Sequence, residues 1–156
     1  MPTAYLGLGT NLGDRHANLH AAVAELASLG AVTRTSRRYE TAPVGYLEQP
    51  RFLNQVVEME TTLDPLPLFQ GVKQVEERMG RTSTFRNGPR LIDIDILLYD
   101  GVVLNTPELA IPHPRLARRA FVLRPLSELI DHVHGTPMVD LLKRVHDQDA
   151  TAVAHE

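Results

Sequence analysis

The chain contains no cysteine, and no apolar run in it approaches the roughly 18 residues that a membrane-spanning helix needs. Without cysteine it can form neither a disulfide bond nor a thiolate metal site, which fits a reducing compartment. The first residues, Met1–Ala4, carry no basic segment ahead of an apolar one, so we expect no signal peptide. These absences predict a cytoplasmic protein that does not associate with a membrane.

Lysine is also scarce. Lys73 and Lys143 are the only two, so arginine supplies nearly all of the positive charge. The formal net charge is −3, which argues against indiscriminate binding to polyanions such as nucleic acid. The 156 residues, of which 43% are hydrophobic and 22% charged, suit a single globular domain spanning 1–156.

Two segments lack acidic residues, Arg78–Ile92 and Leu109–Ser127, and each carries four arginines. Either segment alone is equally consistent with a solvated face of the protein. Together they flank a short stretch that contains Asp93 and Asp95. Planar guanidinium groups match phosphate oxygens, and carboxylates match Mg²⁺. The arrangement therefore indicates a site for a metal ion and a polyphosphate.

Hydrophobic periodicity predicts strands and helices in a definite order. The expected strands are Ala4–Leu8, Ala31–Glu40, Phe52–Thr61 and Leu91–Tyr99. The first helix should follow the turn Gly9–Asp14 and end near Leu29, and the second should begin at Pro65, behind Asp64, and end at Gly80. Two shorter helices are expected at Arg115–Phe121 and Val139–Val145.

The resulting β-α-β-β-α-β order is the split βαβ pattern. We therefore expect an α+β fold: a ferredoxin-like antiparallel sheet with two helices packed on one face, followed by a C-terminal extension. The opposite face of the sheet would be free for ligands. Within Leu91–Tyr99, strict alternation would place Ile92, Ile94, Ile96 and Leu98 on one face.

Asp93 and Asp95 are two residues apart in an expected strand, so their side chains point to the same face. Their Cα atoms lie roughly 7 Å apart at about 3.3 Å per residue, and both carboxylates can reach one metal ion or a pair of ions. Aspartate is rare in strands, and two on one face repel each other unless a cation is present. The alternatives are an exposed pair, or a pair that binds nearby arginines such as Arg90.

Three other features allow a structural or a functional interpretation. The turn Gly9–Asn11 between a strand and a helix can bind an anion through its N–H groups, although such a turn is most often only a cap. His113 lies between two prolines in the second basic segment, and a lone histidine is more often structural than catalytic. We interpret His132 and His134 as surface residues, because no third metal ligand is evident.

Five motifs resemble those of the 6-hydroxymethyl-7,8-dihydropterin pyrophosphokinase family, in the same order and spacing over almost the whole chain. They are Gly7–Arg15, Tyr39–Gly45, Gln49–Asn54, Gly88–Leu97 and Ile111–Pro114. One such motif would be weak evidence, whereas five in register are specific. The resemblance implies transfer of the β,γ-pyrophosphoryl group of ATP to the hydroxymethyl group of 6-hydroxymethyl-7,8-dihydropterin, with release of AMP, in folate biosynthesis.

The resemblance also implies roles for residues at matching positions. Asp93 and Asp95 would hold two Mg²⁺ ions, and Arg81 and Arg90 would complete the catalytic group by stabilising the charge that develops during transfer. Besides Arg81 and Arg90, the positions implied to contact ATP are Lys73, Glu76, Arg86, Ile96, His113 and Arg119. We expect the partners to be ATP and the pterin, without nucleic acid or membrane, and the enzyme to be a monomer.

A pterin needs a flat slot with a polar edge, and Phe52 and Asn54 on one strand face can supply a stacking ring and an amide. From the residues alone, Phe52 and Phe121 are better explained as core. The resemblance instead assigns both rings to the pterin pocket. Further pterin contacts that it implies are Thr41, Pro43, Val44 and Asp93.

Two departures from the family pattern concern the nucleotide. Lys73 stands where the family usually has glutamine. The loop 82–87, which we expect to close over ATP, is one residue shorter than the family's and ends in Asn87, where the family often has an aromatic residue.

Two other classes of function use some of the same features. A metal-dependent phosphohydrolase needs only the carboxylates and the arginines, and it would hydrolyse ATP equally well without a pterin. A non-catalytic RNA-binding module is compatible with a ferredoxin-like sheet. The net charge of −3 and the lack of an exposed aromatic run on a central strand argue against the RNA-binding module.

Overall fold

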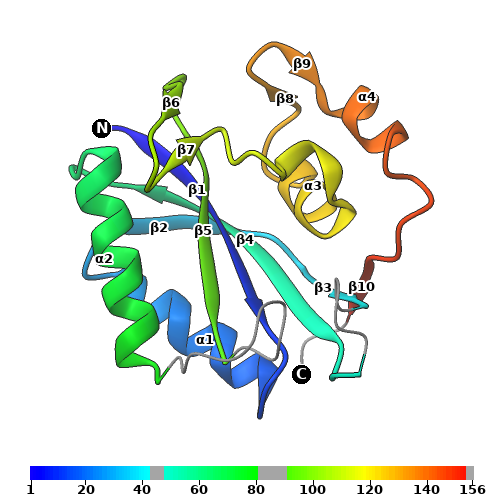
Figure 1. The fold of residues 1–156 in the computed structure, drawn as a ribbon, viewed down its shortest axis with the longest axis horizontal. Coiled ribbons are helices and arrows are strands. Elements are labelled where there is room, and N and C mark those ends of the chain that lie inside the picture. The colour runs from blue at the N-terminus through cyan, green and yellow to red at the C-terminus, as the bar shows by residue number, and fades with distance from the viewer. Residues whose placement is uncertain (43–47, 81–90, 154–156) are drawn as a thin grey trace.

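A computed structural model gives the positions of residues 1–42, 48–80 and 91–153, and the description below is confined to them. In these residues, six strands form one antiparallel sheet in the order β10-β3-β4-β1-β5, with β2 also paired to β4 (Figure 1). The strands are β1 (Thr3–Thr10), β2 (Ala31–Thr35), β3 (Arg38–Thr41), β4 (Phe52–Glu60), β5 (Asp93–Tyr99) and β10 (Thr151–Val153).

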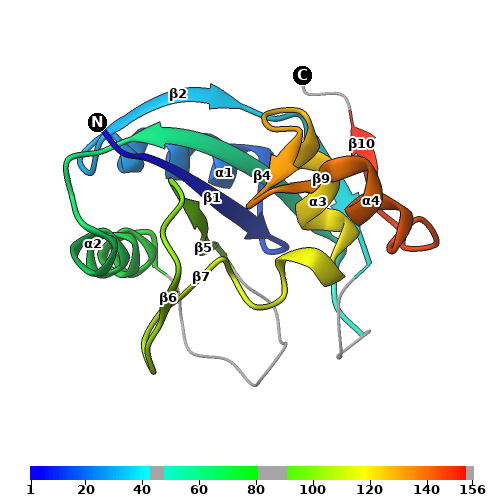
Figure 2. The same cartoon turned by 90° about the horizontal axis from the view of Figure 1, so that it is seen from above.

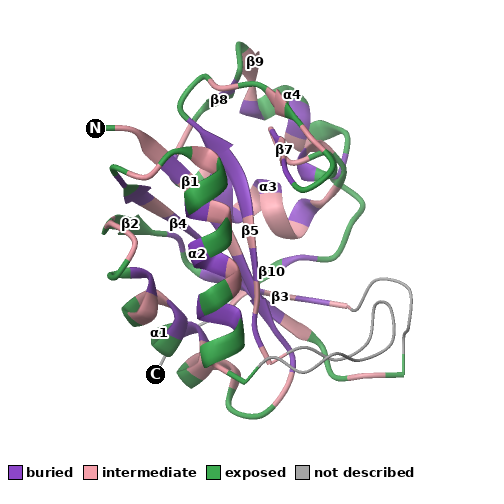
Figure 3. Ribbon diagram, turned by 60° about the vertical axis from the view of Figure 1, so that its left-hand side comes forward, coloured by how far each residue is buried: buried purple, intermediate pink, exposed green. Residues whose placement is uncertain are grey.

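Two helices, α1 (Arg15–Leu26) and α2 (Pro65–Arg78), cover one face of this sheet. Asp14 caps α1 by accepting a hydrogen bond from the Ala17 N–H (3.1 Å), and Pro65 opens α2 as predicted. The outward side of α2 is exposed, while its inner side is buried against the sheet (Figure 3). The fully buried residues of this core include Leu6, Leu19, Leu26, Leu53, Val57, Leu68, Val72, Val75 and Ile94.

The C-terminal extension packs against the opposite face of the sheet (Figure 2). It contains the 3₁₀ helix η1 (Leu116–Arg118), α3 (Ala120–Ser127) and α4 (Met138–Lys143). A second core lies between these elements and the strands; its members include Tyr39, Val56, Leu97, Leu98, Leu116, Leu123, Leu126 and Leu141. We expected this face to be free for ligands. In the structure the extension covers part of it, and a pocket remains beside α3.

The expected single strand Ala31–Glu40 is divided into β2 and β3. Between them, Ser36 donates its N–H to the Val56 carbonyl (2.9 Å), and its Oγ accepts the Val56 N–H (3.0 Å). The hydroxyl thus replaces a backbone carbonyl in the pairing with β4, which lets the chain leave regular strand geometry without a buried unpaired N–H. Alternation of residue types carries no signal for such a substitution, so the prediction of one continuous strand was wrong.

The alternation expected along β5 also fails at one position. The register between β1 and β5 shifts between Tyr5 and Leu6, so that Leu98 faces Tyr5 and Ile96 faces Leu6. Such an irregularity inserts an extra residue and reverses the alternation beyond it. Ile94 and Ile96 therefore pack towards α1 and α2 as predicted, whereas Leu98 belongs to the core on the α3 side.

Several short elements were not predicted or differ in their bounds. Helix α1 ends at Leu26 instead of near Leu29, and the expected helix Arg115–Phe121 is η1 followed by α3. Two small hairpins are formed by β6 (Leu104–Asn105) with β7 (Ala110–Ile111) and by β8 (His132–Val133) with β9 (Thr136–Pro137). Strands of two residues are too short to give a periodic signal. None of the helices in the described ranges is long and apolar enough to cross a membrane.

An ionic contact across the sheet generates a prediction about acid stability. The Glu58 carboxylate accepts hydrogen bonds from Arg34 Nη2 (2.6 Å), from the Tyr5 hydroxyl (2.7 Å) and from Thr33 Oγ1 (2.8 Å). The Arg34 contact, followed by the two hydroxyl bonds, lowers the pKa of Glu58 from 4.5 to about 2. A carboxylate with a lowered pKa stabilises the fold above its unfolded-state pKa and loses that contribution as the pH falls.

We therefore expect Glu58→Gln to lower the free energy of unfolding by about 1 kcal/mol near neutral pH. The difference in the free energy of unfolding between Glu58→Gln and the parent chain should shrink as the pH falls from 4.5 to about 2. Urea unfolding at pH 7, 5 and 3 measures this difference. A difference that stays constant over this range would show that the Glu58 charge does not contribute.

Candidate functional site

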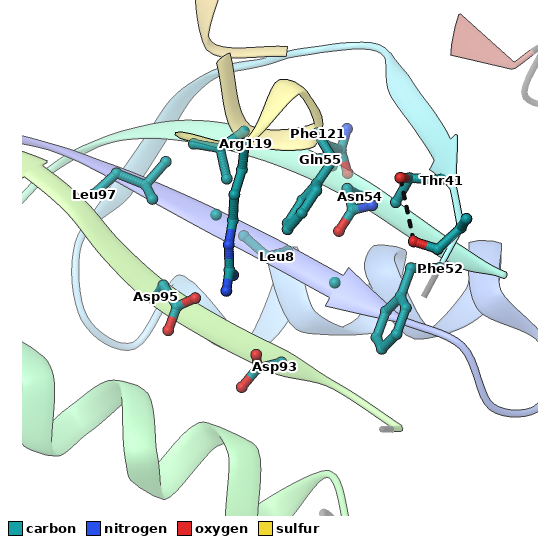
Figure 4. A pocket seen from close by; sticks show the side chains of 14 residues that line it. Leu8, Thr41, Phe52, Asn54, Gln55, Asp93, Asp95, Leu97, Arg119 and Phe121 are labelled. Atoms are coloured by element: carbon teal, nitrogen blue, oxygen red, sulfur yellow. Dashed lines mark hydrogen bonds between the residues drawn. The ribbon is translucent and has the colours of Figure 1, made fainter. Parts of the chain in front are cut away.

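A pocket opens on the sheet face beside α3, with β1, β4 and β5 as its base (Figure 4). We call it the first pocket. Its volume is about 120 Å³. The residues that line it are Gly7, Leu8, Gly9, Thr41, Ala42, Phe52, Asn54, Gln55, Asp93, Asp95, Leu97, Arg119, Phe121 and Val122. It therefore brings together sheet residues and the first turn of α3.

Glycines of β1 make room for the polar side chains of this pocket. Gly7 and Gly9 lie opposite Asp95 and Asp93 in the pairing of β1 with β5. A Cβ atom on Gly9 would lie 2.9 Å from Asn54 Oδ1, closer than real Cβ contacts allow. The side chain of Asn54 consequently fills the space that a larger residue at position 9 would occupy.

Asp93 and Asp95 both line the first pocket, as their two-residue spacing predicts. The surrounding protein, which removes much of the hydration of its carboxylate, and the neighbouring Asp93 charge raise the pKa of Asp95 to about 6. No cluster of three potential His, Asp or Glu ligands occurs in the residues that the structure describes. The donor set is thus two hard carboxylates, and it fits Mg²⁺, which usually takes one or two carboxylates and completes its shell with water and substrate phosphates.

Arg119 extends from the start of α3 towards the two carboxylates (Figure 4). Its Cζ lies 5.2 Å from the centroid of the Phe121 ring. Burial and the nearby Arg115 lower the pKa of Arg119, while Asp95 and Asp93 oppose this shift. The guanidinium is a cation under all ordinary conditions, so it places one positive charge beside the acidic pair.

A second pocket lies on the other side of Asp95, with a volume of about 360 Å³. Its lining residues are Phe69, Ile94, Asp95, Ile96, Thr106, Pro107, Glu108, Leu109, Ala110, His113 and Pro114. Asp95 is common to both pockets. The sequence predicted Ile96 and His113 as residues of this site. It did not predict Phe69 or the hairpin residues 106–110. Tertiary contacts alone bring the hairpin residues to the pocket.

His113 holds a defined orientation in the second pocket. Its Nδ1 accepts the Arg115 N–H (3.1 Å), so the neutral ring carries its proton on Nε2. Nε2 lies 3.9 Å from Asp95 Oδ2. Burial, followed by the charges of Arg119 and Arg115, lowers the pKa of His113. The ring therefore presents an N–H donor towards the junction of the two pockets.

Glu76 lies beneath the site and is 1% exposed. Its Oε2 accepts the buried N–H of Ile94, which stands between the two aspartates (2.7 Å). Its Oε1 contacts Lys73 Nζ at 3.1 Å, and Lys73 lies over the Phe69 ring, 5.3 Å from the centroid. The carboxylate thus supports β5 from α2, a geometry that the sequence did not predict.

The remaining sequence-predicted residues have other positions. Thr10, the last residue of β1, and Asn11, which follows it, bind neighbouring segments of the chain. Thr10 Oγ1 accepts from Asn18 Nδ2 (3.1 Å), and Asn11 Nδ2 donates to the carbonyl of Pro50 (3.0 Å). His132 and His134 are exposed, as interpreted from the sequence. Five candidate residues lie outside the described residues: Pro43, Val44, Arg81, Arg86 and Arg90, as does the loop 82–87.

A carboxylate pair with an arginine beside it, at the junction of two pockets, is typical of an enzyme that acts on a phosphate-bearing substrate. Comparison with solved structures shows that this fold is a known one. Plasmodium falciparum HPPK-DHPS, wild type with pteroate, superimposes with a TM-score of 0.73 at 20% identity, over 94% of this chain and 43% of that one. The chain thus spans less than half of that longer protein and shares its fold over this part.

The sequence itself identifies the family. A model of 7,8-dihydro-6-hydroxymethylpterin-pyrophosphokinase (HPPK) matches residues 5–131. The chain is 48% identical over 132 residues to the 2-amino-4-hydroxy-6-hydroxymethyldihydropteridine pyrophosphokinase of Bacillus subtilis, covering 83% of this chain and 79% of that protein. The protein of the same name from Aquifex aeolicus is 42% identical over 133 residues, or 85% of this chain and 83% of that one. The chain belongs to the 7,8-dihydro-6-hydroxymethylpterin-pyrophosphokinase family.

The position of Glu76 generates a prediction about stability. Glu76→Ala would leave the buried Ile94 N–H without its acceptor, and we expect a loss of about 2 kcal/mol in the free energy of unfolding. Glu76→Gln keeps an acceptor oxygen and should lose less than half as much. Urea unfolding measures both. Glu77→Ala, at an exposed position on the same helix, is the matched control and should change stability by less than about 0.5 kcal/mol. Equal losses for Ala and Gln at position 76 would contradict the assignment.

Proposed function

We propose that the chain transfers the β,γ-pyrophosphoryl group of ATP to the hydroxymethyl group of 6-hydroxymethyl-7,8-dihydropterin and releases AMP, as a step of folate biosynthesis. The observation that carries this proposal is that Asp95 lines two pockets with different linings. Two substrates bound in these pockets would meet at the acidic pair. Holding two reactants in this way can supply much of the rate of a group transfer.

The first pocket suits the pterin ring. Phe52 and Phe121 line it, and Asn54 lies between them in the view of Figure 4. Asn54 Nδ2 is buried and makes no hydrogen bond within the described residues. A buried donor without a partner is costly, and a heteroaromatic ring edge with acceptor atoms would satisfy it. Thr41 lines the same pocket, and we assign Pro43 and Val44 to it from the family resemblance.

The second pocket suits the nucleotide because it combines apolar walls with polar side chains next to Asp95. Ile96 offers it an apolar contact, and His113 offers it an N–H donor. Lys73 and Arg119 both supply positive charge near Asp95. Glu76, in contrast, is too deeply buried to meet the nucleotide directly, so we propose that it supports ATP binding by holding β5.

Asp93 and Asp95 would hold Mg²⁺, and we propose two ions by analogy with the family. Bound Mg²⁺ would neutralise charge on the triphosphate and orient it. The residues of the chain then have separate tasks. The carboxylates fix the metal site on a rigid strand, Arg119 offsets negative charge beside it, and Arg81 and Arg90 would stabilise the transferring group. The new bond joins the hydroxymethyl oxygen to the β-phosphorus as the bond from that phosphorus to AMP breaks.

Three further properties belong to this proposal. The strand order, with β2 and β3 paired to successive segments of β4, supports a ferredoxin-like sheet in which the second strand is divided. Two cores that share the same sheet support one domain for residues 1–156. We also propose that the enzyme works in the cytoplasm as a monomer.

The reaction itself is the first test. Incubation with ATP, Mg²⁺ and the hydroxymethyl dihydropterin should release AMP in proportion to pyrophosphorylated pterin. Omitting the pterin should abolish AMP release, and chelating the metal with EDTA should do the same. Release of ADP, or equal ATP hydrolysis without pterin, would instead favour a kinase or a phosphohydrolase.

The acidic pair should be indispensable to this reaction. We expect Asp93→Asn and Asp95→Asn each to lower kcat by about 1,000-fold or more, because a metal site contributes several kcal/mol to charge stabilisation and 1.36 kcal/mol is tenfold in rate. Asp140→Asn, at an exposed position on α4, is the control and should retain full activity. Melting temperatures close to that of the parent chain would separate lost chemistry from lost folding.

The first pocket should determine pterin affinity alone. We expect Asn54→Ala to raise the KM for the pterin by about 10- to 100-fold, because the substitution removes the amide donor that would bind the ring edge. The KM for ATP should change less than about threefold. Steady-state kinetics with each substrate varied in turn measure both values. An equal rise in both KM values would argue against the assignment of this pocket to the pterin.

A further inference from the structure

The side chain of Gln148 contacts the backbone on both sides of Arg119. Its Nε2 donates to the Arg118 carbonyl (2.8 Å), and its Oε1 accepts the Ala120 N–H (2.9 Å). A single carboxamide in the segment after α4 thus joins the last residue of η1 and the first residue of α3. Both groups of the amide are used, and Arg119 lies between the two bonds.

The Arg119 carbonyl accepts the N–H groups of Val122 and Leu123 (both 3.0 Å), but the start of α3 lacks a side-chain cap of its own. Arg119 is the N-cap of α3, yet its side chain makes no capping hydrogen bond. Its backbone is extended (φ −126°, ψ 113°) between two helical segments. The first N–H groups of a helix have no partner within the helix. Gln148 supplies that partner from a residue 28 positions further along the chain.

The backbone conformation at Arg119 decides where its side chain goes. The side chain passes the Phe121 ring and extends towards Asp95 and Asp93 (Figure 4). A long side chain converts a small rotation of the backbone into a large displacement of its guanidinium. The bonds from Gln148 therefore act on the position of a charge that lies in the first pocket.

The residue after Gln148 is fixed to the opposite wall of the first pocket. The Asp149 carbonyl accepts from Thr41 Oγ1 (2.7 Å), and the Asp149 carboxylate pairs with Arg51. Beyond it, β10 pairs with β3. Thr41 lines the pocket, and Arg51 precedes Phe52, which also lines it. Because Gln148 is attached to this anchored segment, its amide has a defined position from which to hold α3.

We propose that Gln148 is a positioning residue that aims the Arg119 guanidinium at the Asp93–Asp95 pair by holding the backbone on both sides of Arg119. The role rests on the proposed function, because the effect on turnover requires that reaction. Gln148 acts only through Arg119 and touches no substrate. The C-terminal extension is thereby part of the active-site framework as well as a cover for the sheet.

The kinetic test is a double-mutant cycle. Gln148→Met keeps the length of the side chain and removes both hydrogen bonds, so we expect kcat/KM to fall about tenfold. In an Arg119→Ala background the same change should cause little further loss, because the residue through which Gln148 acts is gone. Gln148→Glu keeps an acceptor for the Ala120 N–H and should recover part of the activity. Asp147→Ala, at the exposed neighbouring position, is the control and should leave activity unchanged.

A second readout does not depend on activity. Hydrogen exchange at the Ala120 amide should become at least about tenfold faster in Gln148→Met, since an amide that loses its partner opens more readily. In Gln148→Glu it should stay closer to the parent chain. If the parent chain releases no AMP, the proposed function fails, yet this exchange still tests the contact. Equal losses from Gln148→Met in both backgrounds, or unchanged exchange at Ala120, would overturn the positioning role.

Discussion

The repulsion between two carboxylates on one face of a strand is the constraint around which this site is organised. Asp93 and Asp95 are held on the same side of β5 by the two-residue period of the strand, and they cannot move apart without breaking the pairing with β1. Loss of hydration around the Asp95 carboxylate, followed by the Asp93 charge, raises the pKa of Asp95 to about 6. A like-charge pair of this kind is the pattern expected where binding of a cation offsets the cost.

Support for β5 comes from structures on both of its sides. Within the described residues β5 is the last strand of its sheet, paired with β1 alone, and Glu76 of α2 accepts the Ile94 N–H that faces away from β1. The buried Glu76 carboxylate lies close to those of Asp93 and Asp95 and would by itself increase the repulsion between them. Lys73 offsets that charge from the same helix at 3.1 Å. The strand is thus rigid where the acidic side chains need fixed positions, and this rigidity costs no additional unpaired polar group.

The sequence predicts this site wherever local geometry determines it. The shared face of Asp93 and Asp95, and that of Phe52 and Asn54, follow from strand periodicity alone, and the two sheet-covering helices follow from their apolar stripes. Leu98 was placed on the wrong face because a register shift depends on the partner strand. The bonds of Gln148 join residues about thirty positions apart, and no local pattern predicts such contacts. The arginine positions 81, 86 and 90 stay predictions.

The fold of this chain is kept despite extensive differences in sequence. At 20% identity most side chains differ, yet the backbone superimposes over 94% of the chain. Gly9, opposite Asp93, leaves room for the Asn54 side chain at the base of the first pocket, which a larger residue there would displace. The second pocket is built largely from the β6–β7 hairpin, and the wall of the first from α3. Because Asp95 borders both, substrates bound in the two pockets as proposed above would meet at the strand between them.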